Sequence, residues 1–209
     1  MHASWRILSC LAAASLGWTG LAVADDDVIQ ASELMRRSFS SATSEEWATR
    51  LRQDSTQALC SKYRNQPPPQ VAAQIAADAR SSMRFPESRP LLGDWRQGER
   101  LASIGAGGQI GTIEPDRPDT PRGGNCYACH ALAPTEVAAG TLGPSLTGYG
   151  RRHGTSSESV RSVYQRIYTA QAFTPCSVMP RFGHNGWLTP EQIADIVAYL
   201  LDPASPVNK

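Results

Sequence analysis

The feature that most constrains this chain is the short run Cys126-Tyr127-Ala128-Cys129-His130. Its C-x-x-C-H spacing is the attachment pattern of c-type haem. Two thiols at this spacing reach the two vinyl groups of one porphyrin, and the adjacent imidazole is then held beneath the iron. The motif predicts one covalently attached haem c, with Cys126, Cys129 and His130 binding the cofactor and His130 as an iron ligand.

A C-x-x-C pair without the histidine could also be half of a zinc site or a redox-active dithiol. A zinc site needs two more ligands at similar spacing, but Cys60 and Cys176 stand far from the motif and from each other. A thioredoxin-like dithiol sits in a βαβ setting, whereas this motif follows a stretch rich in Gly and Pro. The pattern therefore favours haem over both alternatives.

The first 24 residues have the layout of a secretory signal peptide. A basic start ending at Arg6 precedes a mostly apolar run and the small residues Ala22-Val23-Ala24, which suit cleavage after Ala24. Ser, Thr and Gly residues dilute this run, while a membrane anchor needs about 20 firmly apolar residues. The run also continues well past Cys10, so we expect no lipidation there. The sequence predicts an exported, periplasmic protein without stable membrane insertion.

Charge excludes one class of partner. The sequence has 20 Lys plus Arg and 19 Asp plus Glu, and residues 1–24 remove Arg6 and no acidic residue, so residues 25–209 are close to neutral. Nucleic-acid binding normally leaves a basic excess or stripe. The basic runs here are no longer than the pairs Arg36-Arg37 and Arg151-Arg152. We therefore expect no nucleic-acid partner.

The spacing of apolar residues predicts a mostly α protein without repeats or alternating strand patterns. Capping-box patterns begin two helices, at Thr43 with Glu46 and at Thr189 with Gln192. After the signal peptide over 1–24, Pro and Gly clusters suggest an N-terminal helical extension over 25–90 and a haem domain over 91–209. We expect helices over residues 43–63, 70–83, 93–104, 155–172 and 189–201, with a long loop over 105–125 and a Gly-rich segment over 140–154.

A single haem needs a sixth ligand or an open site. Met179 precedes Pro180, which favours an extended backbone, and it lies between two predicted helices in a loop that can cover the far face of a haem. Isolated methionines in helical stretches ordinarily fill the core. We favour Met179, and His/Met ligation raises the reduction potential relative to bis-His ligation. The other candidates in residues 25–209 are Met35, Met83, His153 and His184.

Three segments, residues 125–130, 140–148 and 172–186, resemble SoxX, the monohaem cytochrome c subunit of the SoxAX complex in bacterial thiosulfate oxidation. The resemblance runs from about Cys60 to the C-terminus, and its most specific part extends from Cys176 to His184. It implies a class I cytochrome c fold over 91–209, with His130 and Met179 as axial ligands. It also implies that the backbone carbonyl of Pro144 accepts a hydrogen bond from the proximal imidazole, which would fix its tautomer.

The resemblance also implies partners. The complex is an L-cysteine S-thiosulfotransferase: its larger haem subunit, SoxA, joins thiosulfate sulfur to a cysteine of the SoxYZ carrier and releases two electrons. A SoxX-type subunit forms a heterodimer with SoxA and passes those electrons to a downstream cytochrome, without being catalytic alone. Two alternatives stay open, a freestanding monohaem shuttle and an enzyme or sensor with an open haem site.

Residues 25–209 contain four cysteines, of which Cys60 and Cys176 remain after haem attachment. In an exported protein two leftover thiols most simply form a disulfide, which would pin the extension beside the Met179 loop. The alternative is that Cys176, three residues before the predicted iron ligand, is a redox-active or persulfide-carrying thiol.

Overall fold

The computed structural model describes residues 23–106 and 119–209, and within these ranges it contains helices and no strand. The chain forms two compact units, Met1–Ser41 and Ala42–Lys209. Residues 1–22 of the predicted signal peptide lie outside the described residues. No described helix combines the length and the apolar character needed to cross a membrane.

The first unit contains α1 (Val23–Ser38), a helix that the sequence reading did not predict. It begins within the last residues assigned to the signal peptide. Arg37 and Glu33, one turn apart and both exposed, form an ion pair on it. An exposed pair at this spacing stabilises a helix by only about 0.3–0.5 kcal/mol.

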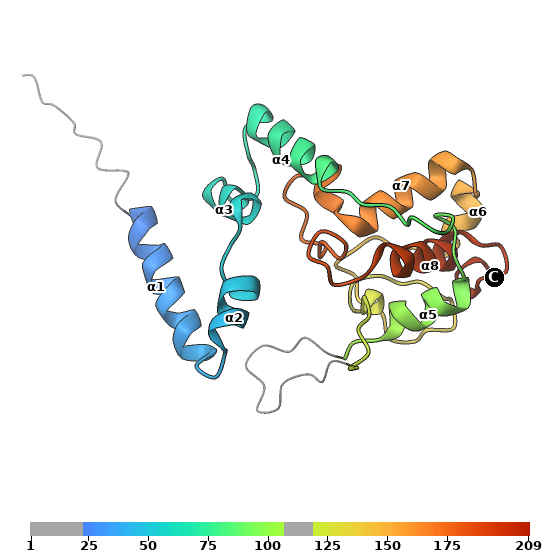
Figure 1. Ribbon diagram of the computed structural model, residues 1–209, viewed down its shortest axis with the longest axis horizontal. Helices are drawn as coiled ribbons and strands as arrows, with labels where there is room; N and C mark the ends of the chain where they lie inside the picture. Colours follow the sequence, from blue (N-terminus) through green and yellow to red (C-terminus); the bar gives the residue numbers. More distant parts are fainter. Residues whose placement is uncertain (1–22, 107–118) are drawn as a thin grey trace, which may run out of the picture. The chain divides into compact units, whose positions relative to one another are not determined.

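The second unit holds the predicted haem residues (Figure 1). Its first elements are α2 (Ser44–Glu46), the π-helix η1 (Trp47–Leu51), α3 (Ser55–Lys62), α4 (Pro69–Ser81) and α5 (Trp95–Ser103). The remaining elements are η2 (Cys126–Ala128), α6 (Tyr149–His153), α7 (Ser157–Tyr168), η3 (Ala170–Ala172), α8 (Pro190–Leu201) and η4 (Pro206–Asn208).

The prediction of one helix over residues 43–63 is wrong, because the chain breaks in the middle of that range. The capping box at Thr43 is present, and the amide of Glu46 donates to Thr43 Oγ1 over 3.1 Å. After η1 the backbone becomes extended at Arg52. Asp54 and Gln57 then form a second capping box, with both hydrogen bonds at 2.9 Å, and start α3. An Asp side chain that caps its own backbone competes with helix continuation, which explains the break.

The helices predicted over residues 70–83, 93–104 and 189–201 are present, with small shifts at their ends. The helix predicted over 155–172 ends earlier than expected, because the backbone is extended at Thr169 and η3 follows as a separate 3-10 turn. In addition, α6 occupies residues predicted as a Gly-rich segment without helix. Gly148 and Gly154 flank it, both with φ of 65°. The amide of Gly150 donates to Asn208 Oδ1 over 2.7 Å, and a Cβ at Gly150 would lie 2.4 Å from the Leu201 carbonyl oxygen. Tertiary contact with the C-terminus, which local periodicity does not report, therefore holds this short helix.

The core forms where α8 lies between α5 and α7 (Figure 1). Side chains on all sides of α8 are buried, from Ile193 to Leu201. The crossing of α5 with α8 is close, because a Cβ at Gly98 would lie 2.0 Å from the carbonyl oxygen of Asp195. This close packing brings the chain on either side of the haem motif together.

Part of the predicted extension belongs to the same compact unit. Ile75 of α4 is buried, and the segment that follows α4 accepts hydrogen bonds from two tyrosines of α7. Tyr164 donates its hydroxyl to the Arg84 carbonyl over 2.6 Å, and Tyr168 donates to that of Ser82 over 3.1 Å. Residues 42–90 thus pack on the residues predicted to form the haem domain.

Candidate haem site

The attachment motif is a single tight turn. Asn125 precedes it in the left-handed region, with φ of 43°, and η2 then spans Cys126–Ala128. The amides of Cys129 and His130 both donate to the Cys126 carbonyl, over 3.1 and 2.9 Å. Neither Cys126 nor Cys129 is in a disulfide. The turn therefore brings two available thiols and one imidazole into one short stretch of backbone.

The proximal side of the site has the hydrogen bond that the SoxX resemblance implies. His130 Nδ1 lies 2.7 Å from the Pro144 carbonyl oxygen. A carbonyl can only accept, so Nδ1 carries the proton and the lone pair of Nε2 is left for a metal. A Cβ at Gly143 would lie 2.2 Å from His130 Cε1, and the amide of Gly143 donates to the Cys129 carbonyl over 2.8 Å. A glycine at this position lets the backbone pass directly against the imidazole.

Met179 lies in the segment between η3 and α8. It is partly buried against the core. Its backbone amide donates a hydrogen bond to Ser177 Oγ over 3.2 Å. Met179 lies outside the described helices. Met179 remains the predicted sixth ligand.

The two histidine alternatives are engaged elsewhere. His184 Nδ1 lies 3.1 Å from Ser82 Oγ, and burial, together with the nearby Arg181, lowers the pKa of His184. His153 packs its ring against Tyr149 within α6, with the centroids 4.2 Å apart. Neither contact involves Nε2, so the preference for Met179 over the two histidines stays a prediction from its place in the loop before Pro180.

The zinc and dithiol alternatives gain no support. Burial raises the pKa of the Cys126 thiol to about 12, whereas reactive dithiols depend on a lowered thiol pKa. Over residues 23–106 and 119–209, no three His, Cys, Asp or Glu side chains are grouped to hold a metal ion. The donor set instead fits haem c: two thiols for thioether bonds, an imidazole with a free Nε2, and a thioether as the candidate second axial ligand.

A hydrogen bond between two tyrosines joins the attachment turn to α8. Tyr127 and Tyr199 place their hydroxyl oxygens 2.6 Å apart, and Tyr199 is fully buried. Burial and this bond raise the pKa of Tyr199 well above its usual range. Sequence reasoning missed this pair, because two tyrosines 72 positions apart carry no signal that they meet.

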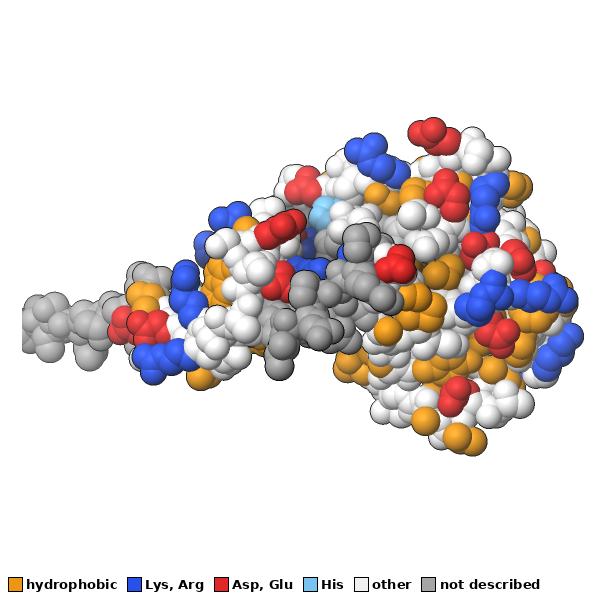
Figure 2. Space-filling model, turned by 60° about the horizontal axis from the view of Figure 1, so that its bottom comes forward, with side chains coloured by type: hydrophobic (Ala, Val, Ile, Leu, Met, Phe, Trp, Pro, Cys, Tyr) orange, Lys and Arg blue, Asp and Glu red, His pale blue; other side chains and the backbone are white. Residues whose placement is uncertain are grey.

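A cleft of about 920 Å³ opens beside the attachment turn. On one side lie residues 123–125, next to Cys126, and on another Pro180, Arg181 and Phe182, which follow Met179. Trp187 contributes a wall: its Nε1 donates to the Gly123 carbonyl over 2.7 Å, and Arg122 stacks on its ring. Across the face in Figure 2, acidic and basic side chains are interspersed, in keeping with the near-zero net charge.

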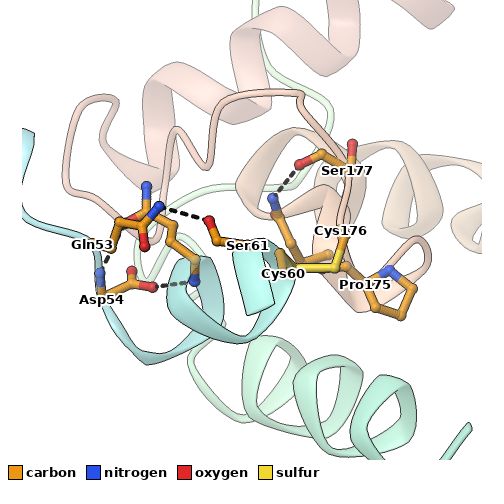
Figure 3. The surroundings of a disulfide bond; sticks show 9 residues. Gln53, Asp54, Cys60, Ser61, Pro175, Cys176 and Ser177 are labelled. Atoms are coloured by element: carbon orange, nitrogen blue, oxygen red, sulfur yellow. Dashed lines mark hydrogen bonds between the residues drawn. A yellow bond between two sulfur atoms is a disulfide. The ribbon is translucent and has the colours of Figure 1, made fainter. Parts of the chain in front are cut away.

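Cys60 and Cys176 form a disulfide across 116 positions of sequence, with their Cα atoms 5.6 Å apart. Figure 3 shows it joining α3 to the segment that leads to Met179. Cys176 is therefore not a free thiol in this structure. Close by, Arg181 Nη2 lies 2.5 Å from Asp54 Oδ2. Sequence reasoning missed Asp54, although the Asp54-x-x-Gln57 spacing is a capping-box signal.

Comparison with known proteins agrees with this site. The family model described as "Cytochrome c" matches residues 123–202, from just before the attachment turn to the end of α8. With the helical fold, this match confirms the predicted class I cytochrome c fold, and it implies a covalently bound haem c. The chain is also similar to an "Uncharacterized lipoprotein" of Aquifex aeolicus (strain VF5), 42% identical over 163 residues that cover 75% of this chain and 73% of that protein. This similarity extends upstream of the cytochrome c match, since only a few residues follow it.

Proposed function

Because this chain belongs to the same family as the Aquifex aeolicus protein and carries a cytochrome c domain, we propose that it is the monohaem electron-accepting subunit of a SoxAX-type complex in thiosulfate oxidation. The cytochrome c domain supports a role as an electron-transfer haem protein. A role in thiosulfate oxidation is more specific than that. One observation carries this more specific role. The segment from Cys176 to His184 resembles SoxX, and a disulfide ties it to α3, which lies outside the residues matched by the cytochrome c model.

The site's residues suit electron acceptance. Bound haem supplies reversible one-electron chemistry at its iron. Cys126 and Cys129 would hold it covalently, and His130 with Met179 would ligate it, a pair that raises the reduction potential relative to two histidines. Pro144 keeps the proximal imidazole in one tautomer. Because one haem stores one electron, the two electrons released per conjugation leave through this subunit in two successive steps.

We also propose that the protein works in the periplasm with three partners: a SoxA-type haem subunit in a heterodimer, the SoxYZ carrier reached through that complex, and a downstream cytochrome. Export is supported by the leader-like residues 1–24 and by the lipoprotein description of the Aquifex relative. The mass of the N-terminal peptide of periplasmic protein tests the route. A free amine at Asp25 supports cleavage after Ala24. A diacylglyceryl group on an N-terminal Cys10 would instead show that the protein is lipidated and is not cleaved after Ala24.

Copurification with a SoxA-type subunit tests the function. Coexpressed in a host with cytochrome c maturation, tagged SoxA-type protein should retain this chain through gel filtration. Thiosulfate and the SoxYZ carrier should then reduce its haem, followed by absorbance. Met179→Ala serves as a matched variant, since it should still copurify and accept electrons more slowly. Recovery as a monomer in the presence of the partner, with no reduction by thiosulfate, would instead support the freestanding shuttle.

A further inference from the structure

The backbone around Met179 has little support of its own. Among described residues, no amide from Val178 to Phe182 donates to a backbone carbonyl, and Val178 is largely exposed. The Met179 amide donates to the Ser177 side chain. In loops, local order depends on such contacts, and segments with few of them open readily. Besides the packing of Met179 against the core, the position of this side chain therefore depends on the contacts that flank it.

Two of those flanking contacts reach the same short helix, α3. Three residues before Met179, Cys176 is joined to Cys60, which is buried on α3. Two residues after Met179, Arg181 pairs with Asp54, the N-cap of α3. Figure 3 shows Asp54 at the start of α3 and Cys60 farther along it. The loop is thus fixed to one element on both sides of the predicted ligand.

The ion pair is costly to break, because one of its partners is buried. The Arg181 side chain is 9% exposed and that of Asp54 is 41% exposed. Removing the partner of a buried charge leaves that charge uncompensated, which is costly. Burial raises the pKa of Asp54, but the Gln57 amide and the Arg181 guanidinium outweigh it and hold the pKa below its ordinary value. Asp54 is therefore ionised at neutral pH and available to Arg181.

Helix α3 is held in shape by its own hydrogen bonds. Asp54 and Gln57 close its first turn with a capping box. Before the helix, Gln53 donates its amide to Ser61 Oγ over 2.7 Å, linking the start of α3 to its last turn. An ordered helix keeps Asp54 and Cys60 at a fixed spacing, so it can hold the loop at both of its contact points.

We propose that α3 positions the sixth ligand of the haem, with Asp54 and Cys60 as positioning residues that hold Met179 through Arg181 and Cys176. This inference rests on the proposed ligation by Met179, and it adds that residues upstream of the cytochrome c domain control that ligation. Loosening either contact lets the thioether leave the iron more often, so that an added ligand competes better.

Imidazole binding to the purified ferric holoprotein tests the proposal, since imidazole must displace the methionine. In Asp54→Asn the amide still caps α3 but the charge is lost, and the imidazole Kd should fall by about five- to tenfold. In Cys60→Ala/Cys176→Ala it should fall at least tenfold. Asp54→Glu, which keeps the charge, should bind imidazole within about twofold of the wild type.

A matched control separates positioning from general destabilisation. Asp195 pairs with Arg89 and accepts from the Asp94 amide, away from the Met179 loop in sequence and in its contacts. Asp195→Asn should lower the Tm and leave the imidazole Kd unchanged. If Asp54→Asn and the double cysteine variant lower the Tm but keep the wild-type imidazole Kd, α3 has a merely structural role and the proposal is wrong.

Failure of the premise is distinguishable from failure of the proposal. Ferric wild-type protein should show the far-red sulfur-to-iron absorption band, and Met179→Ala should lack it. If the wild type lacks the band, Met179 is not the ligand and the positioning proposal falls with it. If the band is present in the wild type and the α3 variants bind imidazole as the wild type does, the ligand stands and the positioning role alone is overturned.

Discussion

His130 Nδ1 lies 2.7 Å from the carbonyl oxygen of Pro144, although 14 residues separate them. This bond decides which imidazole nitrogen keeps its proton, and so which one faces the metal site. Gly143, adjacent to Pro144, makes the approach possible because it has no Cβ to meet the ring. The attachment turn and the loop that carries Gly143 and Pro144 are therefore joined through this hydrogen bond.

Gly143→Ala should lower the yield of protein with correctly ligated haem, because the added Cβ would lie 2.2 Å from His130 Cε1. The measurement is the ratio of haem absorbance to protein after periplasmic expression. Gly154→Ala is the control: its Cβ meets nothing within 4 Å, and its positive φ costs only about 1–2 kcal/mol. Equal haem ratios in the two variants would contradict the role of Gly143. His130→Ala should block maturation or leave the haem badly ligated.

Met179→Ala should abolish the far-red band of the ferric protein and lower the reduction potential while the haem stays attached. The physical reason is that the thioether favours the reduced iron relative to stronger donors. Redox titration and absorption spectra give both readouts. Met83→Ala is the matched control, since Met83 is partly buried against the core. Met83→Ala should lose stability but keep the band. A band that survives Met179→Ala would show that another residue ligates the iron.

The Cys60–Cys176 disulfide should be present in protein isolated from the periplasm. Denatured, non-reduced protein should gain no label from iodoacetamide. After reduction, the same protein should gain two labels. Removing the bond in Cys60→Ala/Cys176→Ala should reduce the free energy of unfolding by about 2–4 kcal/mol, since it closes a long loop. Denaturant titration of the haem-loaded protein measures this loss. Two labels without reduction would mean that both thiols are free, and would revive a reactive role for Cys176.

Gly98→Ala should destabilise the fold by about 3 kcal/mol, because the new Cβ would lie 2.0 Å from a backbone oxygen of α8 and the helices would have to separate. Thermal unfolding followed by circular dichroism checks this. In Gly105→Ala the nearest atoms belong to the Asn125 side chain, at 3.0 Å or more, so that control should lose much less. Similar Tm values for the two variants would argue against a close crossing.

The contribution of Asp54 to stability should depend on pH. Its folded-state pKa lies below the ordinary value of about 3.9, so the stabilisation is present above that pH and is lost as the pH falls through the folded-state pKa. The difference in unfolding free energy between the wild type and Asp54→Asn should therefore be constant near pH 7 and shrink below about pH 4. Denaturant titrations across this range measure it. A difference that persists at pH 2 would show that the charge of Asp54 is not responsible.

Much of the fold followed from local sequence signals. The capping boxes at Thr43 and Thr189 are present because each needs only residues within one turn. The break before α3 was missed although its signal, Asp54 with Gln57, is equally local. By contrast, α6 depends on its contact with Asn208, far along the chain, so periodicity could not reveal it.

The chemistry of the site can be predicted from the amino-acid sequence: two thiols and an imidazole at C-x-x-C-H spacing specify the haem, because attachment depends on groups adjacent in the chain. The surroundings of that motif follow from the folded structure. Packing of elements far apart in sequence brings distant residues to the attachment motif, namely Pro144 and Tyr199. It also brings Asp54 and Cys60 to the loop that carries Met179. Long-range packing is not encoded in any short window of residues, and it is what joins α3 to the loop that carries Met179.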